Sequence, residues 1–377
     1  MSTTRSFEPF VARLSEFIRT CLNLSDSPEA NAAREGLTFE ALAQELFELQ
    51  FSHNAPYRKI CEYRKRTPEQ VAGWREVPFV PTLAFKDLEL TSLPPELRCQ
   101  VFHSSGTTEQ RPSRHFHSQE SLAIYELSLR TWFAAHLDSP DTKLPFLSLT
   151  PPGSQAPHSS LVHMFETLLA DWGAPGSSFA GTKDAEQTWR VDPTGVLNAL
   201  SRASETGEPL WLFGTAFNYV HLLDALEDQH RRFQLPAGSK ILETGGYKGR
   251  SRSLPKEELH QWMVDRLGVR PGDILCEYGM SELSSQAYDW PNDASTNRSR
   301  EFRFPPWARC RVISPETGLE VGTGEVGLLQ IVDLANVFSV MAIQTEDLVR
   351  RGDLGFQWIG RASDAESRGC SLMSTAS

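Results

Sequence analysis

Small hydroxyl residues surround a glycine in the stretch "HSSGTT", which directly follows a short strand-like run. The hydroxyl residues are Ser104, Ser105, Thr107 and Thr108, and the glycine is Gly106. Glycine lets the backbone approach a ligand closely, and successive backbone N–H groups in such a loop can converge on an anion. Arg111 and Arg114 follow and can form charge-assisted hydrogen bonds with phosphate oxygens. The stretch predicts a phosphate-binding loop. Taken alone, it is more typical of an exposed polar turn, and it is not a P-loop sequence.

Two further segments place polar or flexible residues directly after a predicted strand. In "ETGGYKGRSR" (243–252), adjacent glycines follow the strand at the end where α/β sheets bind ligands, although a simple strand-exit turn explains them equally. In "CEYGMSEL" (276–283), an aromatic residue precedes a tight turn and then Glu282. A carboxylate beside bound phosphate is unfavourable unless a divalent cation lies between them, so Glu282 is a candidate Mg²⁺ ligand. The alternative is a glutamate at a helix N-terminus, stabilised by the helix dipole.

The elements that must position these segments alternate between two types. Buried strands are expected at "LPFLSLT" (144–150), "PLWLFGT" (209–215) and "SKILETGG" (239–246). Amphipathic helices are expected between and after them, at 159–173, 216–233 and 256–268. This alternation predicts an α/β fold with a mainly parallel sheet covered on both faces.

The two ends of the chain have sequence patterns that differ from this strand–helix alternation. Apolar residues recur at helical spacing over residues 7–50, and short strands separated by Gly and Pro turns begin near residue 300. We expect an antiparallel or barrel-like subdomain there. The predicted organisation is a helical segment (1–75), an α/β core (76–300), a β-rich subdomain (301–362) and a C-terminal tail (363–377).

The composition excludes several classes of protein. The 377 residues are 40% apolar and 23% charged, which is typical of a soluble globular chain. The net charge of -11 argues against a protein that coats nucleic acid. We find no apolar run of about 20 residues that would span a bilayer. The N-terminus lacks the pattern of an export signal, so a cytoplasmic location is expected.

Cysteine and histidine give weaker signals. The six cysteines show no CxxC spacing, so neither a structural zinc site nor disulfides are expected, and most thiols should be buried or inert. His103 and His115 bracket the "SSGTT" loop, where a packed or solvent-facing role is the more common one.

The order of the three segments adds information that none of them carries alone. "SSGTT", a later Gly-Gly turn and "YGMSE" resemble the adenylate-forming superfamily. The closer resemblance is to the acyl-protein synthetases of bacterial bioluminescence fatty-acid reductase complexes, from about Val77 to the C-terminus. The segments that carry it are "HSSGTTEQRPSRHF", "LETGGYKGRSRSLPKEELH", "EYGMSELSSQAYDW", "FPPWARCRVISP", "VDLANVFSVMAIQTEDL" and "GRASDAESRGCSLM".

The resemblance implies the fold and the reaction. The fold is the large N-terminal domain of adenylate-forming enzymes, without the usual mobile C-terminal domain. A carboxylate attacks the α-phosphate of ATP, pyrophosphate leaves, and an acyl-adenylate remains, with Mg²⁺ and positioned donors offsetting the growing charge. The loop 104–108 is then expected to hold the triphosphate, with Thr107 and Thr108 as the principal hydroxyl contacts. Glu282 is expected to hold Mg²⁺.

The resemblance also assigns the nucleoside contacts. Gly245, Gly246 and Tyr247 are expected to line the adenine pocket, and Tyr278 and Gly279 to lie near the base. Ser281 is expected beside the phosphates. Asp347, in "QTEDL", corresponds to the acid that binds the ribose hydroxyls, because a carboxylate can accept two hydrogen bonds from a cis-diol. Arg361 corresponds to the basic residue near the ribose and the α-phosphate.

Two departures from the superfamily pattern stand out. Glu109 follows the threonine pair where many members have glycine, and an acid there would repel phosphate unless it points outward. The sequence also ends about 17 residues after Gly360, before the domain that usually delivers a catalytic lysine. Lys248, Arg250 or Arg114 are the candidates to replace that charge.

Cys370, in "SRGCSLM", is the expected acyl carrier. By resemblance, the acyl group passes from the adenylate to this thiol and then to a partner reductase or acyltransferase. Arg368 would favour the reactive thiolate. The alternative for Cys370 is an incidental thiol in a terminal tail.

Three functions remain open from the sequence. The first is ATP-dependent activation of a carboxylic acid, expected to be a fatty acid, followed by acylation of Cys370. The second is a ligase of the phenylacetate-CoA ligase type, which passes the acyl group to coenzyme A or a carrier protein. The third is a catalytically silent subunit that binds a nucleotide or an acyl group.

Overall fold

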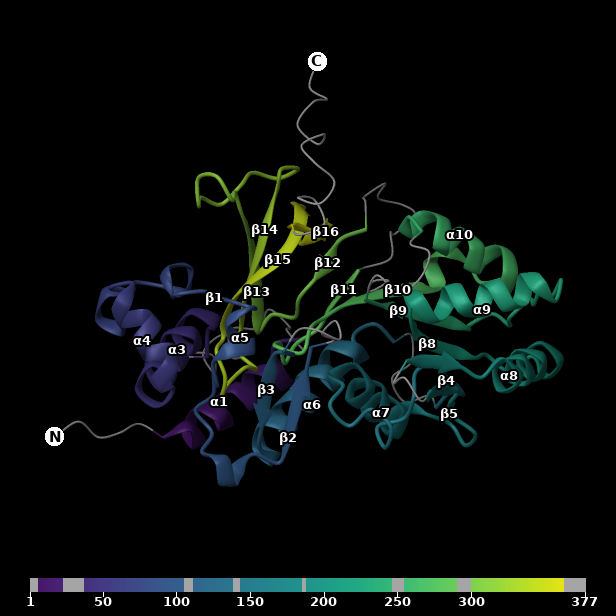
Figure 1. The fold of residues 1–377 in the computed structure, drawn as a ribbon, viewed down its shortest axis with the longest axis horizontal. Coiled ribbons are helices and arrows are strands. Elements are labelled where there is room, and N and C mark those ends of the chain that lie inside the picture. The colour runs from purple at the N-terminus through teal and green to yellow at the C-terminus, as the bar shows by residue number, and fades with distance from the viewer. Residues whose placement is uncertain are drawn as a thin grey trace, which may run out of the picture. The chain divides into compact units, whose positions relative to one another are not determined.

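The chain forms two compact units. The computed structural model describes residues 6–22, 37–104, 111–137, 143–184, 188–245, 254–289 and 300–362. Unit 1 comprises Met1–Ala135, Ser281–Gln286 and Glu301–Ser377, and unit 2 comprises His136–Met280 and Ala287–Arg300 (Figure 1). The four-part organisation expected from the sequence stays a prediction.

Unit 2 contains the predicted parallel sheet. Its strands are β4 (Phe146–Ser148), β5 (Ser178–Phe179), β8 (Trp211–Thr215), β9 (Lys240–Thr244), β10 (Ile274–Tyr278) and β11 (Ala287–Asp289). Neighbours pair in the order β5-β4-β8-β9-β10-β11, parallel except for the antiparallel β10–β11 pair. Strands β6 (Gly181–Lys183) and β7 (Trp189–Val191) form a separate hairpin.

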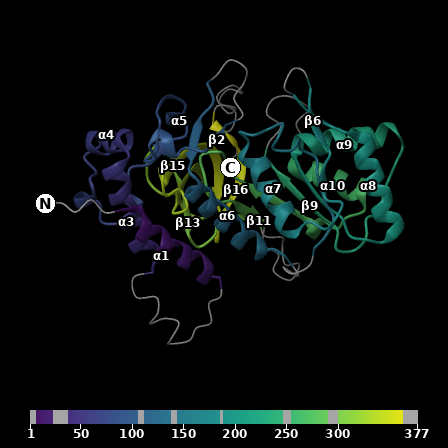
Figure 2. The same cartoon turned by 90° about the horizontal axis from the view of Figure 1, so that it is seen from below.

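Helices cover both faces of this sheet. They are α7 (Ser160–Trp172), α8 (Pro193–Thr206), α9 (Ala216–Asp228) and α10 (Lys256–Leu267). Leu212 of β8 lies in one apolar core with Leu223 of α9 and Met263 of α10, and these helices lie together in both views (Figures 1 and 2). The adjacent Phe213 points to the other face and contacts Phe165 of α7, with ring centroids 5.1 Å apart. The predicted α/β arrangement is confirmed.

Local sequence explains where these helices begin and end. Thr215 and Asn218 form a capping box at the start of α9. Helices α8 and α10 end at Gly207 and Gly268, with φ of 73° and 70°, which is the left-handed conformation that glycine adopts without a Cβ penalty.

Unit 1 begins with helices in the part of the chain where the sequence predicts them. They are α1 (Phe7–Thr20), α3 (Phe39–His53) and α4 (Ala55–Tyr63). The short α5 (Ala84–Asp87) and α6 (Gln119–Ala134) follow, and the sequence did not predict these two helices. Phe10, Leu14 and Ile18 form the buried stripe of α1 at intervals of four residues. Short 3₁₀ turns are η1 (Pro68–Gln70), η2 (Trp74–Glu76) and η3 (Pro95–Leu97), and unit 2 adds η4 (Pro271–Asp273).

The β-rich part of unit 1 is the antiparallel subdomain expected from about residue 300. Its strands are β13 (Ala308–Ile313), β14 (Val326–Asp333), β15 (Ala342–Arg351), β16 (Phe356–Arg361) and β12 (Phe302–Arg303), which pair in that order. The short β1 (Val80–Pro81) joins β15 in parallel. A hairpin of β2 (Gln100–His103) and β3 (Arg114–His117) completes the unit.

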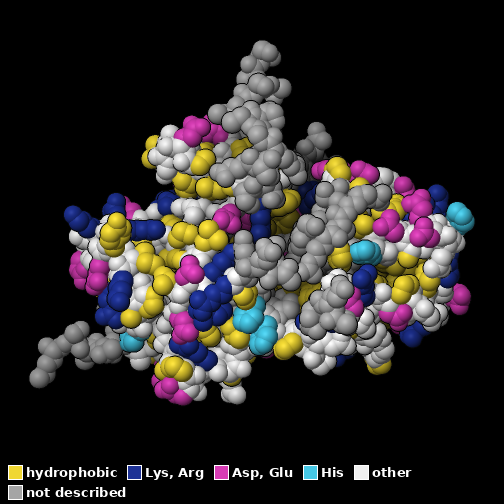
Figure 3. Space-filling view, viewed as in Figure 1, with side chains coloured by type: hydrophobic (Ala, Val, Ile, Leu, Met, Phe, Trp, Pro, Cys, Tyr) yellow, Lys and Arg dark blue, Asp and Glu magenta, His cyan; other side chains and the backbone are white. Residues whose placement is uncertain are grey.

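The surface mixes charges of both signs. Figure 3 shows acidic and basic side chains interspersed on one face of the molecule. Within the ranges that the structure describes, no helix has the length and apolar character needed to cross a membrane.

Candidate active site

The β2–β3 hairpin brings together the two ends of the hydroxyl-rich loop. His103 and Arg114 are its last cross-strand pair, and the backbone N–H of Ser113 donates to Ser104 Oγ at 3.0 Å. The loop therefore starts and ends at one point on unit 1. Ser105, Gly106, Thr107, Thr108 and Glu109 lie outside the described residues, and their contacts with phosphate stay a prediction.

Ser281, in the part of "YGMSE" that belongs to unit 1, lies against this hairpin, although 168 residues separate it from Ser113. Their hydroxyl oxygens are 3.5 Å apart. His115 Nδ1 lies 2.8 Å from the carbonyl oxygen of Ser281, so that nitrogen carries the proton. Burial lowers the pKa of His115 to about 4, and the ring is therefore a neutral, packed support for the segment.

Glu282 is a buried carboxylate beside the hairpin, with only 5% of its surface exposed. Ser281 Oγ donates to it at 3.0 Å. Burial raises its pKa, while hydrogen bonds from Ser113 and Ser281 and the positive charge of Arg361 oppose that rise. No helix begins at this residue, so a helix N-terminal role is wrong. A buried acid with incompletely compensated charge fits the oxygen ligand that Mg²⁺ requires.

A second buried acid supports the segment that carries Glu282. Asp333 accepts hydrogen bonds from the backbone N–H of Ser284 at 2.9 Å and the hydroxyl of Ser285 at 2.7 Å. Asn336 Nδ2 donates to the backbone oxygen of Glu282 at 2.8 Å. Sequence reasoning missed these positioning residues, because a side chain that supports a distant loop leaves no local motif.

Asp347 and Arg361 face each other across β15 and β16. They are cross-strand partners, and Arg361 Nε lies 3.6 Å from Asp347 Oδ1. Trp358 Nε1 also donates to Asp347, at 3.3 Å. Asp347 is 6% exposed, whereas the Arg361 side chain is 63% exposed. The Asp347 carboxylate is therefore fixed by its contacts with Trp358 and Arg361, whereas the exposed Arg361 guanidinium can still contact a ligand.

Arg114 has a local acidic partner. Its guanidinium lies 3.2 Å from Glu89, which also pairs with Arg98 at 2.8 Å. The hydrogen bond from Arg98 lowers the pKa of the Glu89 carboxyl, and the positive charges of Arg98 and Arg114 lower it further. Arg114 therefore contributes a charge already shared with Glu89. The other two candidate catalytic cations, Lys248 and Arg250, lie outside the described residues.

The remaining candidates belong to unit 2, at the carboxyl edge of its sheet. Thr244 and Glu277 are paired on the neighbouring parallel strands β9 and β10, so Gly245 and Tyr278 both follow at the same edge. Gly245 has φ of 64°, which favours glycine. Gly279 comes next after Tyr278, and Gly246 and Tyr247 are outside the described ranges. These positions match the edge where α/β sheets bind ligands.

Unit 2 also holds a buried polar cluster that the sequence did not indicate. The thiol of Cys276 donates to Glu243 at 3.1 Å, and His260 Nε2 lies 3.4 Å from Glu243 and 3.5 Å from Cys276. Thiolate, imidazole and carboxylate groups are the side-chain ligands that zinc binds, but in this cluster the three side chains contact one another. Burial, with the charges of Asp289 and Glu243, raises the pKa of the Cys276 thiol. No short spacing signals the set, because β9, α10 and β10 each contribute one residue.

Comparison with known proteins connects this geometry to a family. The family model described as "Acyl-protein synthetase, LuxE" matches residues 23–376. The chain belongs to this family. A long-chain-fatty-acid–luciferin-component ligase of Vibrio harveyi is 22% identical over 311 residues, which cover 81% of this chain and 77% of the relative. The Aliivibrio fischeri ligase of the same name is 21% identical over 346 residues, covering 88% and 86%.

Solved structures show the fold of this acyl-protein synthetase family member. A 2-hydroxyisobutyryl-CoA ligase, in an open conformation in complex with 2-HIB-AMP and CoA, superposes with a TM-score of 0.61 and 13% identity. The match covers 85% of this chain and 73% of the ligase. The same ligase in its postadenylation state gives a TM-score of 0.62, again with 13% identity, covering 85% and 66%. The fold of adenylate-forming enzymes, expected from the sequence, is confirmed.

Proposed function

We propose that this protein uses ATP to activate a long-chain fatty acid as its acyl-adenylate and then transfers the acyl group to its own Cys370. The observation that carries the first step is the grouping in unit 1 of the 104–113 loop ends, the Ser281–Glu282 segment and the Asp347–Arg361 pair. Family membership supports acyl activation, and the names of the two relatives support a long-chain fatty acid as the substrate.

Adenylate formation replaces one bond to the α-phosphorus by another. A carboxylate oxygen of the fatty acid bonds to the α-phosphorus, and the bond to the bridging β-phosphate oxygen breaks, so that pyrophosphate leaves with the electron pair. When bound, Mg²⁺ neutralises charge on the phosphate oxygens. Glu282 is the residue proposed to hold it. Ser104 and the hydroxyls up to Thr108 bind the triphosphate, and Asp347 accepts hydrogen bonds from the ribose.

Arg361 is the cation proposed beside the α-phosphate. Its side chain is exposed, and its charge acts on both Glu282 and Asp347. Its ion pair with Asp347 orients the guanidinium before ATP arrives, which favours stabilisation of charge that develops in the transition state. Lys248 stays a second proposed catalytic cation.

Acyl transfer forms a thioester and releases AMP. The Cys370 thiolate attacks the acyl carbonyl carbon, the carbon–sulfur bond forms, and the bond from that carbon to the phosphate oxygen breaks. AMP leaves with the electron pair, and the thiol proton goes to solvent. AMP is a good leaving group and a thiolate is strongly nucleophilic, so no further activation is required. A partner reductase or acyltransferase would collect the acyl group.

Transfer to coenzyme A or a carrier protein is the second candidate. The ligases that share the fold act with CoA by their names, but at 13% identity this likeness supports the architecture alone. In that case Cys370 would be dispensable. A silent binding subunit is the third candidate.

One incubation tests all three. The purified protein is mixed with ATP, Mg²⁺ and a radiolabelled long-chain fatty acid, with and without coenzyme A. We expect pyrophosphate release and hydroxylamine-labile label on the protein, absent in Cys370→Ser and retained in the control Cys99→Ser, whose cysteine is exposed. Label found only on coenzyme A would favour the second candidate. If no pyrophosphate is released, the third candidate, a silent binding subunit, would be favoured.

A further inference from the structure

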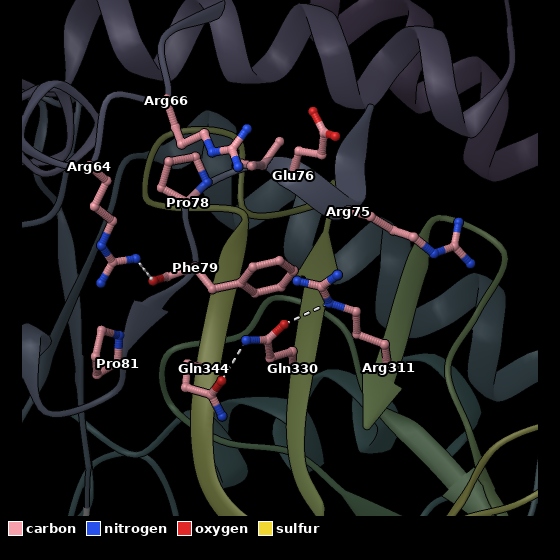
Figure 4. Close-up of a pocket in the computed structure, with 11 residues that line it drawn as sticks. Arg64, Arg66, Arg75, Glu76, Pro78, Phe79, Pro81, Arg311, Gln330 and Gln344 are labelled. Atoms are coloured by element: carbon pink, nitrogen blue, oxygen red, sulfur yellow. Dashed lines mark hydrogen bonds between the residues drawn. The ribbon is translucent and has the colours of Figure 1, made fainter. Parts of the chain in front are cut away.

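A cavity of about 440 Å³ opens in unit 1 between the segment after α4 and the strands β13, β14 and β15 (Figure 4). Four arginines and a single glutamate line it. The lining residues are Arg64, Arg66, Arg75, Glu76, Val77, Pro78, Phe79, Pro81, Arg311, Gln330 and Gln344. The volume is in the range of small-molecule sites and well above that of a single inorganic ion.

A row of hydrogen-bonded side chains forms the floor of this arginine cavity. Arg311, Gln330 and Gln344 are successive cross-strand partners on β13, β14 and β15. Arg311 Nε donates to Gln330 at 2.6 Å, and Gln330 Nε2 donates to Gln344 at 2.6 Å. The Arg311 guanidinium lies 4.6 Å from the centre of the Phe79 ring. The row orients Arg311 but uses only its Nε; within the described residues its two terminal nitrogens make no hydrogen bond.

The cavity has more positive than negative charge. Arg64 donates to the carbonyl oxygen of Phe79 at 2.6 Å, which leaves its charge unpaired by any acid among the described residues. The side chain of Arg66 has neither a hydrogen bond nor an ion pair in the part of the chain described here. Arg75 lies 3.6 Å from Glu320, an acid that also pairs with Arg351 at 3.1 Å.

Two of these cations act on each other. Burial lowers the pKa of Arg311, the negative charge of Glu320 opposes this, and the positive charge of Arg75 adds a smaller lowering. Gathering like charges in one concavity is unfavourable unless an anion enters it, and the potential that they create attracts anions.

This cavity is separate from the candidate active site. Residues of β15 alternate between buried and partly exposed from Ile343 to Val349, as expected for a strand whose side chains point to opposite faces. Gln344 is one of the partly exposed residues of β15 and lines the arginine cavity. Asp347 is one of the buried residues, which point to the other face of the strand, and it pairs with Arg361. The two sites therefore use opposite faces of the same strand.

We propose that the arginine cavity binds an organic phosphate. Guanidinium groups match phosphate oxygens in bidentate geometry, and Arg311 presents its two terminal nitrogens from a fixed position. Phe79, Pro78 and Pro81 provide an apolar wall for the organic part of the ligand. This inference does not depend on the proposed function, because none of its residues belongs to the candidate active site.

Calorimetric titration of the purified protein tests the assignment, with inorganic pyrophosphate and fructose 1,6-bisphosphate as probes. Both should bind the wild-type protein, and Arg311→Gln should weaken binding roughly tenfold, as expected for loss of a charge-assisted contact. Arg66→Gln should also weaken binding, and this change removes no contact within the described residues. Arg58→Gln, on α4 but outside the cavity, should bind as the wild type does.

Three results would overturn the proposal. They are the absence of heat with both probes at millimolar concentration, equal affinity in wild type, Arg66→Gln and Arg311→Gln, and binding of citrate as tight as that of fructose 1,6-bisphosphate. Asp347→Asn serves as the cross-control, because it should weaken ATP binding without changing the affinity for fructose 1,6-bisphosphate. Thermal unfolding of each variant checks that the fold is retained.

Discussion

Arg361 and Asp347 are cross-strand partners whose side chains approach to 3.6 Å, and the charge of Arg361 also acts on the buried Glu282. One exposed guanidinium thus connects two buried acids that are 65 positions apart in the sequence. If unit 1 binds ATP as proposed, substitutions at the two acids should affect different parts of the reaction.

Asp347→Asn should weaken ATP binding while the protein stays folded. The amide keeps the shape of the side chain but loses the charge that the ribose hydroxyls and Arg361 share. We expect the dissociation constant for ATP to rise roughly tenfold to a hundredfold, measured by calorimetry. Asp353→Asn, an exposed acid in the turn before β16, is the matched control. Unchanged ATP affinity in Asp347→Asn would rule out the ribose role.

Glu282→Gln should slow adenylate formation more than it weakens ATP binding. The change removes one negative charge but can still accept the hydrogen bond from Ser281. We expect fatty-acid-dependent pyrophosphate release to fall roughly a hundredfold and to require more Mg²⁺. A wild-type Mg²⁺ dependence in this variant would remove Glu282 from the metal site.

Glu277 should make stability depend on pH near neutrality. Burial raises its pKa to about 7, opposed by the hydrogen bond from Thr244 and reinforced by Glu243. The folded protein therefore holds this proton over a pH range in which the unfolded chain releases it. The stability from the neutral form is fully present below the unfolded pKa of about 4.3 and is lost as pH rises through 7.

Glu277→Gln should remove this pH dependence. Relative to the variant, the free energy of unfolding of the wild type should fall by about 2 kcal/mol between pH 5 and pH 8, measured by urea denaturation. Glu258→Gln, exposed on α10, should leave the wild-type profile unchanged. Parallel profiles for wild type and Glu277→Gln would contradict the raised pKa.

Asp289→Asn should destabilise unit 2 strongly. The Asp289 side chain is 1% exposed and accepts from Lys256 at 2.8 Å, from Arg300 at 2.9 Å and from the backbone N–H of Cys276 at 2.7 Å. Its loss leaves two partly buried cations without their counter-charge, at a cost of about 3–5 kcal/mol. Denaturant titration measures this decrease in the free energy of unfolding. Asp228→Asn, exposed at the end of α9, should change stability by less than about 0.5 kcal/mol. Similar stability in both variants would contradict the counter-charge role.

The sequence by itself determined the elements and the kinds of residue available for chemistry. Alternating strand and helix patterns predicted β4, β8 and β9 with α7, α9 and α10, because periodicity and caps are local properties of the chain. The order of "SSGTT", "ETGG", "YGMSE" and "QTEDL" predicted the family. Most residues expected to bind ATP and Mg²⁺ came from these motifs or from positions beside them, whereas Arg361 and the acyl carrier Cys370 came from the segment "GRASDAESRGCSLM".

Only the tertiary structure decided which of these residues meet. Ser113 with Ser281, the support of Glu282 by Asn336, and the Glu243–His260–Cys276 cluster all depend on packing between segments far apart in the chain. The arginine cavity depends on strand register, because a shift of one residue would turn Arg311 to the other face of its sheet. Register and packing are set by the whole core, so no local pattern in the sequence could reveal these contacts.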